Sequence, residues 1–199
     1  MAEKYRQIML TPAVQAAQER YFGRHQVAAR APEHDTFTDE EAAFIASRDS
    51  FYLATTNSDG WPYIQHRGGP PGFLKVLGPH LLGFADLKGN RQLLSVGNIE
   101  GDDRVSLFLM DYPARERLKI LGHTRILDAR ENTELADQLS PAPELRDQVE
   151  RLFLIDAVSF DWNCPQYITP RYTAVEVDKI AAPLRERIAE LEARLAARQ

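Results

Sequence analysis

Residues 51–69 read FYLATTNSDGWPYIQHRGG, and this stretch decides the fold. Two segments rich in apolar and β-prone residues flank the polar run 57–60. An Asp-Gly pair between such segments predicts a tight β-hairpin, because Gly accepts the positive φ that the turn requires. We therefore expect the chain to reverse at Asp59-Gly60 and to return through 61–67.

A second polar segment follows the next apolar stretch. Residues 81–86 (LLGFAD) predict a strand, and residues 87–92 (LKGNRQ) bring cations, side-chain amides and glycine-exposed N–H groups. A helix that begins near Arg91 would add the N–H groups of its first turn. Taken alone, Arg67 is typical of a solvated strand end and 88–91 of an ordinary polar turn. Their order and spacing instead predict two strand ends that converge on one phosphate.

Composition sets the class of protein. The 199 residues are 44% hydrophobic and 27% charged, as in a globular chain, and the formal net charge of -5 disfavours a broad nucleic-acid surface. The single Cys164 excludes an intramolecular disulfide, and no Cys/His group has the spacing of a metal cage. The N-terminus lacks the apolar core of a signal peptide, and no stretch approaches ~20 apolar residues. We expect a cytoplasmic protein that binds neither membrane nor metal.

The remaining segments predict short strands with peripheral helices. Thr11-Pro12 begins a helix that Gly23 ends, and Thr38 with Glu41 forms a capping box for a helix over 39–48. Further strands are expected over 73–77, 80–85, 104–110, 117–128 and 151–161. Further helices are expected over 91–96, 132–139 and 144–150, from about 174, and again from Pro183. Gly122, inside a long strand, indicates a bulge or a close backbone approach. This pattern is typical of an antiparallel barrel with helical additions.

Several motifs carry a family resemblance: Ile64–Gly69, Phe73–Leu77, Phe84–Asp86, Gly89–Gln92 and Leu118–Gly122. Over about residues 38–175 the chain resembles the pyridoxamine 5'-phosphate oxidase-related, FMN-binding split-barrel family. It is most similar to an uncharacterised bacterial branch, in which His-Arg-Gly-Gly stands where the true oxidase has Arg followed by apolar residues. The resemblance therefore implies flavin binding and does not by itself imply vitamin B6 oxidation.

The resemblance also implies an architecture and an assembly. We expect a mainly β protein, a split β-barrel with N-terminal and C-terminal helices. Its regions would be an N-terminal helical arm over 1–37, the FMN-binding barrel over 38–172 and C-terminal helices over 173–199. Members of this family place FMN at the interface of a homodimer, so a homodimer is expected.

FMN needs cations and N–H donors at its phosphate and flat apolar or backbone surfaces at its ring. The residues expected at the phosphate are Arg67, Gly89, Asn90, Arg91 and Gln92. Those expected along the ring are Gly68, Gly69, Phe84, Ala85 and Asp86. The family implies that Trp162, Asn163, Gln166 and Arg171 close the far side. His66, a neighbour of Arg67, is the candidate donor near the flavin N5 atom, and no catalytic residue is otherwise assigned.

The function predicted is that of an FMN-dependent oxidoreductase with a small, unidentified substrate. Two alternatives remain open: a flavin-binding storage or sensor protein without turnover, and a relative that binds heme or a deazaflavin. A vitamin B6 oxidase would need a second cationic site, for which Arg115, Arg117, Lys119 and Arg171 are available. These charges are equally compatible with exposed loop ends. Trp162 is equally compatible with a plug at the barrel end.

Overall fold

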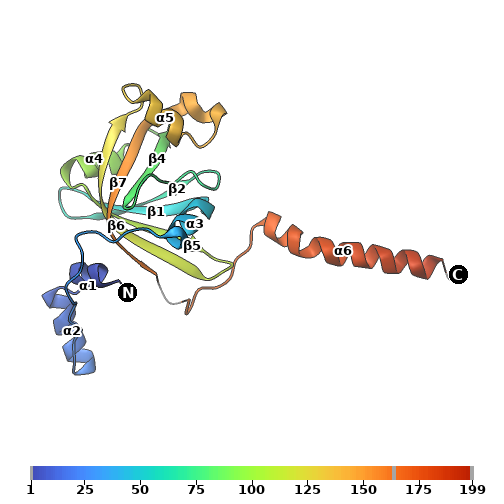
Figure 1. Ribbon diagram of the computed structural model, residues 1–199, viewed down its shortest axis with the longest axis horizontal. Coiled ribbons are helices and arrows are strands. Elements are labelled where there is room, and N and C mark those ends of the chain that lie inside the picture. The colour runs from blue at the N-terminus through green and yellow to red at the C-terminus, as the bar shows by residue number, and fades with distance from the viewer. Residues whose placement is uncertain (1, 163–164, 198–199) are drawn as a thin grey trace. The chain divides into compact units, whose positions relative to one another are not determined.

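The computed structural model describes residues 2–162 and 165–197 (Figure 1). These residues divide into two compact units, one formed by 2–110 and 117–162 and the other by 111–116 and 165–197. The helices are α1 (Glu3–Met9), α2 (Pro12–Phe22), α3 (Asp39–Ser47), α4 (Leu94–Gly101), α5 (Thr133–Leu139), a 3₁₀ helix (Pro143–Gln148) and α6 (Ala174–Ala196). The strands are β1 (Ser50–Thr56), β2 (Pro62–Gly68), β3 (Lys75–Val76), β4 (Leu81–Leu87), β5 (Arg104–Asp111), β6 (Glu116–Asp128) and β7 (Val149–Trp162).

The predicted hairpin is confirmed. β1 and β2 pair antiparallel from Ser50 with Gly68 to Thr56 with Pro62. Gly60 has φ 83°, and its N–H donates to the Asn57 carbonyl at 2.9 Å. The turn therefore forms where the Asp-Gly pair predicts it, because glycine alone reaches this φ without a Cβ clash.

The seven strands form one sheet in the order β2-β1-β5-β6-β7-β4-β3. β2 is first in this order and β4 is sixth, yet an Arg67 guanidinium nitrogen lies 2.6 Å from an Asp86 oxygen. The Phe51 ring of β1 also meets the Phe84 ring of β4 edge-on, with centroids 5.4 Å apart. The sheet therefore curls until its two ends meet, as expected for a split barrel.

The barrel interior is aromatic and aliphatic. Phe84 and Phe153, on the paired strands β4 and β7, stack with centroids 4.7 Å apart and are almost fully buried. Alternate residues of β5, namely Val105, Leu107 and Leu109, point inward. The other β5 residues are exposed or half-exposed, so only one face of this strand is buried. A second cluster of buried apolar residues packs α5 against β4 and β7, which lie beside it in Figure 1.

Four element boundaries differ from the sequence predictions. The strand expected over 73–77 keeps only Lys75–Val76, because Phe73 and Leu74 instead enter the core from a loop. α4 begins at Leu94 rather than Arg91 and continues through Gly97-Asn98. α6 is one helix with Pro183 inside it, although an interior proline removes one N–H donor and clashes with the preceding turn. α1 was not predicted.

Gly122 lies at a β-bulge, as its position in the strand predicts. The register of β6 on β7 shifts between Leu121 and Gly122. A Cβ atom at Gly122 would lie 2.5 Å from the backbone oxygen of Asp156, closer than any relaxed contact. The glycine lets the two strands approach each other at this bulge.

We expect Gly122→Ala to destabilise the protein by about 1–3 kcal/mol, because the added methyl group must displace backbone rather than a side chain. Gly97→Ala is the matched control. A Cβ built at Gly97, in α4, would meet no heavy atom of the described residues within 4 Å apart from its chain neighbours and its own helix backbone. Alanine there should therefore stabilise the helix by about 0.5–1 kcal/mol. Urea unfolding of the three proteins measures both changes. Equal midpoints for Gly122→Ala and the parent would refute the close approach.

α6 has an apolar stripe formed by Leu184, Ile188, Leu191 and Leu195, all exposed.

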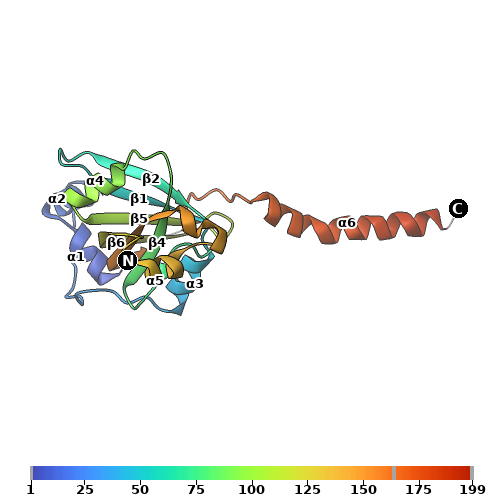
Figure 2. The same ribbon diagram turned by 90° about the horizontal axis from the view of Figure 1, so that it is seen from above.

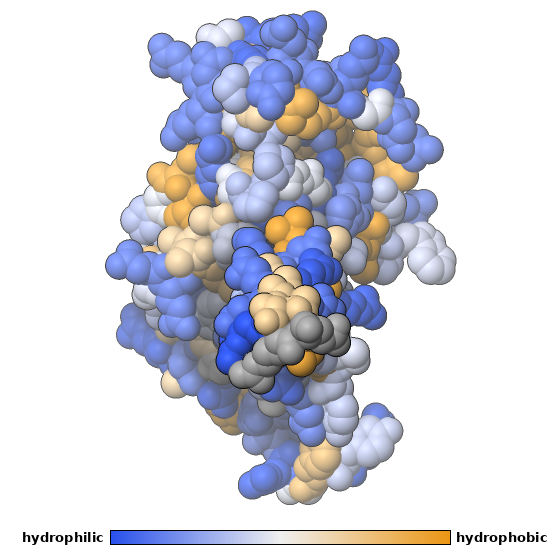
Figure 3. Space-filling view, turned by 90° about the vertical axis from the view of Figure 1, so that its right-hand side faces the viewer, coloured by the Kyte–Doolittle hydropathy of each residue, from blue (hydrophilic) through white to orange (hydrophobic). Residues whose placement is uncertain are grey.

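On the face drawn in Figure 3, hydrophilic residues predominate and apolar residues form scattered patches. Within the described part of the chain, no helix combines the length and the hydropathy that crossing a bilayer requires.

Candidate functional site

A cleft of about 180 Å³ opens where the two ends of the curled sheet meet. Tyr63, Gln65 and Arg67 line one wall, because alternate residues of β2 share one face. Asp86 from β4 and Arg151 from β7 lie opposite, paired across the two strands. The end of β4, the loop after it and the first turn of α4 complete the lining with Leu87, Gly89, Asn90, Arg91, Gln92, Leu93, Leu94, Ser95 and Val96.

Arg67 is held by three different contacts. Its Nη1 atom donates to Asp86 at 2.6 Å, and its guanidinium carbon lies 5.1 and 5.6 Å from the ring centroids of Phe153 and Phe84. Its side chain is 13% exposed. The Nε atom is buried and has no hydrogen-bond partner among the described residues. An arginine fixed in this way keeps its charge at the cleft and has an N–H donor without an acceptor.

Arg91 approaches the same cleft from the loop after β4. It is exposed and has no ion-pair partner in the part of the chain that the structure describes. Arg91 and Leu93 have φ values of 60° and 54°, a region that residues with a Cβ adopt only with strain. Such strain persists where the surroundings impose it, and it is frequent at binding sites. Arg91 offers the cleft a guanidinium that no described residue neutralises.

Amide and helix groups add uncharged donors. The Asn90 side-chain oxygen accepts the Gln92 backbone N–H at 3.1 Å, which shapes the loop. α4 lies beside β1 and β2 (Figure 2), fixed by Ser95 to Gln65 at 2.7 Å and by Asn98 to Thr55 at 2.9 Å. Leu94, Ser95 and Val96, the first residues of α4, line the cleft. The positive end of the helix dipole therefore faces the cleft.

The charge of the cleft lining is positive. Its charged residues are Arg67, Arg91, Arg151 and Asp86, three positive charges and one negative, or +2. Asp86 accepts from Arg67 at 2.6 Å and from Arg151 at 2.8 Å, so one carboxylate serves two guanidinium groups. Arg151 also meets Glu150 at 2.9 Å. This arrangement leaves the lining with a net attraction for an anion.

Residues 37–152, more than half of the sequence, match the family model described as pyridoxamine 5'-phosphate oxidase. The chain belongs to the pyridoxamine 5'-phosphate oxidase family. The sequence resemblance is confirmed by this match. No curated protein sequence matches the chain.

The solved structures similar to this family member have low sequence identity to it and TM-scores just under 0.5. A candidate pyridoxamine 5'-phosphate oxidase from Lactobacillus delbrueckii is 19% identical with a TM-score of 0.49, covering 64% of this chain and 94% of that one. HupZ from Group A Streptococcus is 13% identical with a TM-score of 0.49, covering 68% and 99%. General stress protein 26 from Bacillus anthracis is 15% identical with a TM-score of 0.47, covering 62% and 91%.

Not all residues predicted to bind cofactor line the cleft of this family member. Arg67, Asp86 and Gly89–Gln92 do. His66 does not, because it points to the opposite face of β2 and packs edge-on against Tyr52 at 5.7 Å. Phe84 and Ala85 are buried in the core.

Gly68 and Gly69 also lie outside the cleft lining. A Cβ at Gly69 would lie 2.7 Å from the Phe73 ring, and the Gly69 N–H donates to Asp49 at 2.9 Å. The bare backbone expected to receive a flat ring is therefore occupied by the protein's own phenylalanine. In this chain Gly69 allows the Phe73 ring to pack closely against the backbone.

The segment expected to close the far side divides between the two units. The Trp162 indole donates to Glu41 at 2.7 Å and meets the Phe44 ring edge-on, so it packs on α3. Burial raises the pKa of Glu41, but hydrogen bonds from Thr38 and Trp162 outweigh it and hold that pKa below the usual value. Gln166 and Arg171 are exposed residues of the second unit, where Arg171 lies over Tyr112 at 5.0 Å. Asn163 and Cys164 lie outside the described residues.

Sequence reasoning missed Arg151, Tyr63, Gln65 and Ser95. Arg151 lines the cleft because it pairs with Asp86 across β4 and β7. The two residues are 65 apart in the sequence, so no local pattern reveals the pairing. Tyr63 and Gln65 could have been found, because they share the face of Arg67 at the two-residue period of a strand. Ser95 depends on where α4 begins.

A larger cavity of about 760 Å³ adjoins the cleft and shares Arg91, Leu93, Val96 and Arg151 with it. Its lining contains more carboxylates than arginines: Glu100, Asp128, Asp147 and Glu150 against Arg91, Arg130 and Arg151. The side chain and backbone N–H of Arg130 donate to Asp128 and lower its pKa to about 2. Because Asp128 is then ionised near neutral pH, this cavity is a poorer place for a phosphate than the cleft.

Proposed function

We propose that this chain binds FMN, with the phosphate in the cationic cleft, and uses it to transfer electrons or hydride to a small substrate. The observation that carries the proposal is the pair Arg67 and Arg91. They come from β2 and from the loop after β4, line one cleft, and include a guanidinium without an ion-pair partner among the described residues. Membership of the family supports a flavin.

The donor set of the cleft fits a phosphate monoester. A dianion between Arg67 and Arg91 would balance the +2 charge of the lining. The guanidinium groups of Arg67 and Arg91 line the cleft and carry the N–H donors for charge-assisted bonds. Asn90, Gln92 and the first turn of α4 offer uncharged donors. Charge-assisted bonds of this kind are about twice as strong as neutral ones.

The ring must be bound largely outside this cleft. Sites for ligands of this size usually enclose ~300–1,000 Å³, more than the 180 Å³ present here. The adjoining cavity offers room beside Leu93 and Val96. We propose that a second copy of the chain completes the ring site, so that the working unit is a homodimer. Exposed Trp61 and Ile64 on the hairpin supply an apolar surface for such an interface.

When bound, FMN supplies the redox chemistry through its isoalloxazine ring. The protein holds the phosphate with Arg67 and Arg91, and Asp86 keeps the Arg67 and Arg151 side chains oriented. The described residues of the cleft include no histidine or cysteine, so they point to binding rather than proton transfer. The group that delivers a proton, if the substrate requires one, would belong to the completed ring site.

Reconstitution with FMN followed by anaerobic reduction tests this function. We expect the protein to retain FMN through gel filtration as a dimer, and NADH or NADPH to bleach the flavin absorption. A retained flavin that neither nucleotide reduces would instead support a storage or sensor protein. If the protein did not retain FMN but showed a Soret band after incubation with heme, the cofactor would be heme and not FMN.

A further inference from the structure

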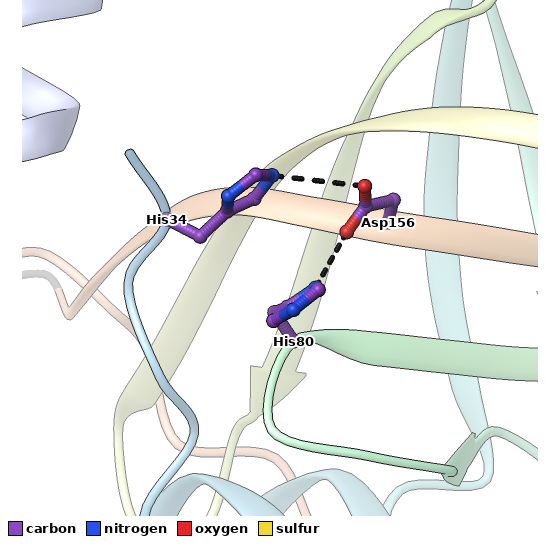
Figure 4. A group of neighbouring side chains, drawn as sticks. All are labelled: His34, His80 and Asp156. Atoms are coloured by element: carbon purple, nitrogen blue, oxygen red, sulfur yellow. Dashed lines mark hydrogen bonds and ion pairs between the residues drawn. The ribbon is translucent and has the colours of Figure 1, made fainter. Parts of the chain in front are cut away.

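A second polar cluster lies away from the cationic cleft. It consists of His34, in the connector between α2 and α3, His80, in the turn before β4, and Asp156, on β7 (Figure 4). One potential ligand atom from each residue lies within 4.8 Å of the others. The three side chains are half-exposed, at 28%, 44% and 47%, so a solute can reach them.

Backbone hydrogen bonds fix all three positions. The Ala157 N–H donates to the His80 carbonyl at 2.7 Å, and the Phe37 N–H donates to the Pro79 carbonyl at 2.7 Å. The Asp35 N–H, next to His34, donates to the Val158 carbonyl at 3.0 Å. The connector is therefore fastened to β7 at Asp35 and to the β3–β4 turn at Phe37, just after His34. The site is pre-formed by the backbone, which lowers the entropy lost on binding a ligand.

The side chains converge on the carboxylate. His80 Nδ1 lies 2.6 Å from Asp156 Oδ1, and His34 Nε2 lies 3.6 Å from Asp156 Oδ2 (Figure 4). The two imidazole rings stack with centroids 4.8 Å apart. In a tetrahedral site with bonds of about 2.0–2.1 Å, ligand atoms are about 3.3 Å apart. Small rotations of half-exposed side chains therefore suffice to bring the three atoms to that separation.

Open space adjoins the cluster. A cavity of about 340 Å³ is lined by His80, Asp156, His123 and Asp103, among others. His123 pairs with Asp156 across β6 and β7, but its Nδ1 lies 2.8 Å from Asp103. It is turned to a different carboxylate and is not part of the converging set. The cavity leaves room for water molecules to complete a coordination shell.

We propose that His34, His80 and Asp156 bind one divalent transition-metal ion, with Zn²⁺ as the reference ion. Two imidazoles and one carboxylate suit Zn²⁺ and its neighbours, whereas Mg²⁺ and Ca²⁺ prefer oxygen ligands alone. The ion would join segments 46 and 76 residues apart, so its binding would fasten the N-terminal connector to the sheet. This site is independent of the flavin site, since the two share no residue.

Calorimetric titration of the full chain with ZnCl₂ tests the proposal. We expect one ion per chain, and a Tm about 5–10 °C higher at a hundredfold excess of Zn²⁺ over its Kd, because the ion binds only the folded state. MgCl₂ should produce neither effect. A parent chain that binds Zn²⁺ no more tightly than Mg²⁺ would overturn the assignment.

Variants locate the ion. His34→Gln, His80→Gln and Asp156→Asn should each weaken Zn²⁺ binding by about tenfold or more, while His123→Gln, at the same cavity, should change it by less than about threefold. Circular dichroism shows whether each variant is folded, and Co²⁺ provides a second readout through its d–d absorption. Equal weakening by His123→Gln and His80→Gln, or an unchanged Co²⁺ spectrum in all three ligand variants, would show that the ion binds elsewhere.

Discussion

Replacing Arg91 with glutamine is expected to weaken FMN binding by about 10- to 100-fold. Arg91 is the exposed arginine of the cleft, with no ion-pair partner among the described residues, so its charge is available to the phosphate. Glutamine keeps a polar side chain with N–H donors but loses the charge, and it is shorter and has two N–H donors instead of five. A change of this size corresponds to about 1.4–2.8 kcal/mol, within the range of one charge-assisted hydrogen bond. Fluorescence quenching of FMN measures it.

Two controls keep this result specific. Arg104→Gln removes another exposed arginine, at the start of β5, which pairs with Asp102 and lies outside the cleft lining. It should leave the Kd unchanged. Arg130→Gln removes an arginine of the adjoining cavity. If Arg130→Gln weakened FMN binding and Arg91→Gln did not, the phosphate would occupy the larger cavity. Arg67 is less suitable for this test, because its loss would leave Asp86 partly unpaired in the protein interior.

The sequence predicts the fold wherever local chemistry decides it. The Asp-Gly turn, the Thr38–Glu41 capping box and the Thr11 and Gly23 helix caps all form as expected. The predicted ends of helices and strands are wrong where tertiary packing determines where an element begins or ends. The loop 89–93 resembles the start of a helix in sequence, yet positive φ values at Arg91 and Leu93 delay α4 to Leu94. Nothing in the local sequence reports that constraint.

The same distinction between local chemistry and tertiary packing applies to the candidate site. Arg67 and Arg91 reach one cleft because β2 and β4 meet when the sheet curls, which the family resemblance implies and composition does not. His66 was placed beside Arg67 by its position in the sequence, although neighbouring strand residues point to opposite faces. The proposed metal ligands, by contrast, could not be predicted from the sequence at all. Ligands 46 and 76 residues apart have no sequence spacing that predicts a metal cage, and only the fold assembles them.

The cleft is proposed to bind the cofactor by its phosphate. Comparing FMN with riboflavin, which has the same ring and ribityl chain but no phosphate, tests that claim without changing the protein. Two arginines with charge-assisted bonds to a phosphate predict that riboflavin binds about 100-fold more weakly or worse. Because the difference comes from the cleft, Arg91→Gln should weaken FMN binding and leave riboflavin binding unchanged.

The most direct measurement is therefore a pair of equilibrium titrations of the parent protein, one with FMN and one with riboflavin, at the same ionic strength. The account predicts that FMN binds tightly and that riboflavin loses about two orders of magnitude or more in affinity. Equal affinities for the two flavins would contradict it, because they would show that the cationic cleft between Arg67 and Arg91 plays no part in binding the cofactor.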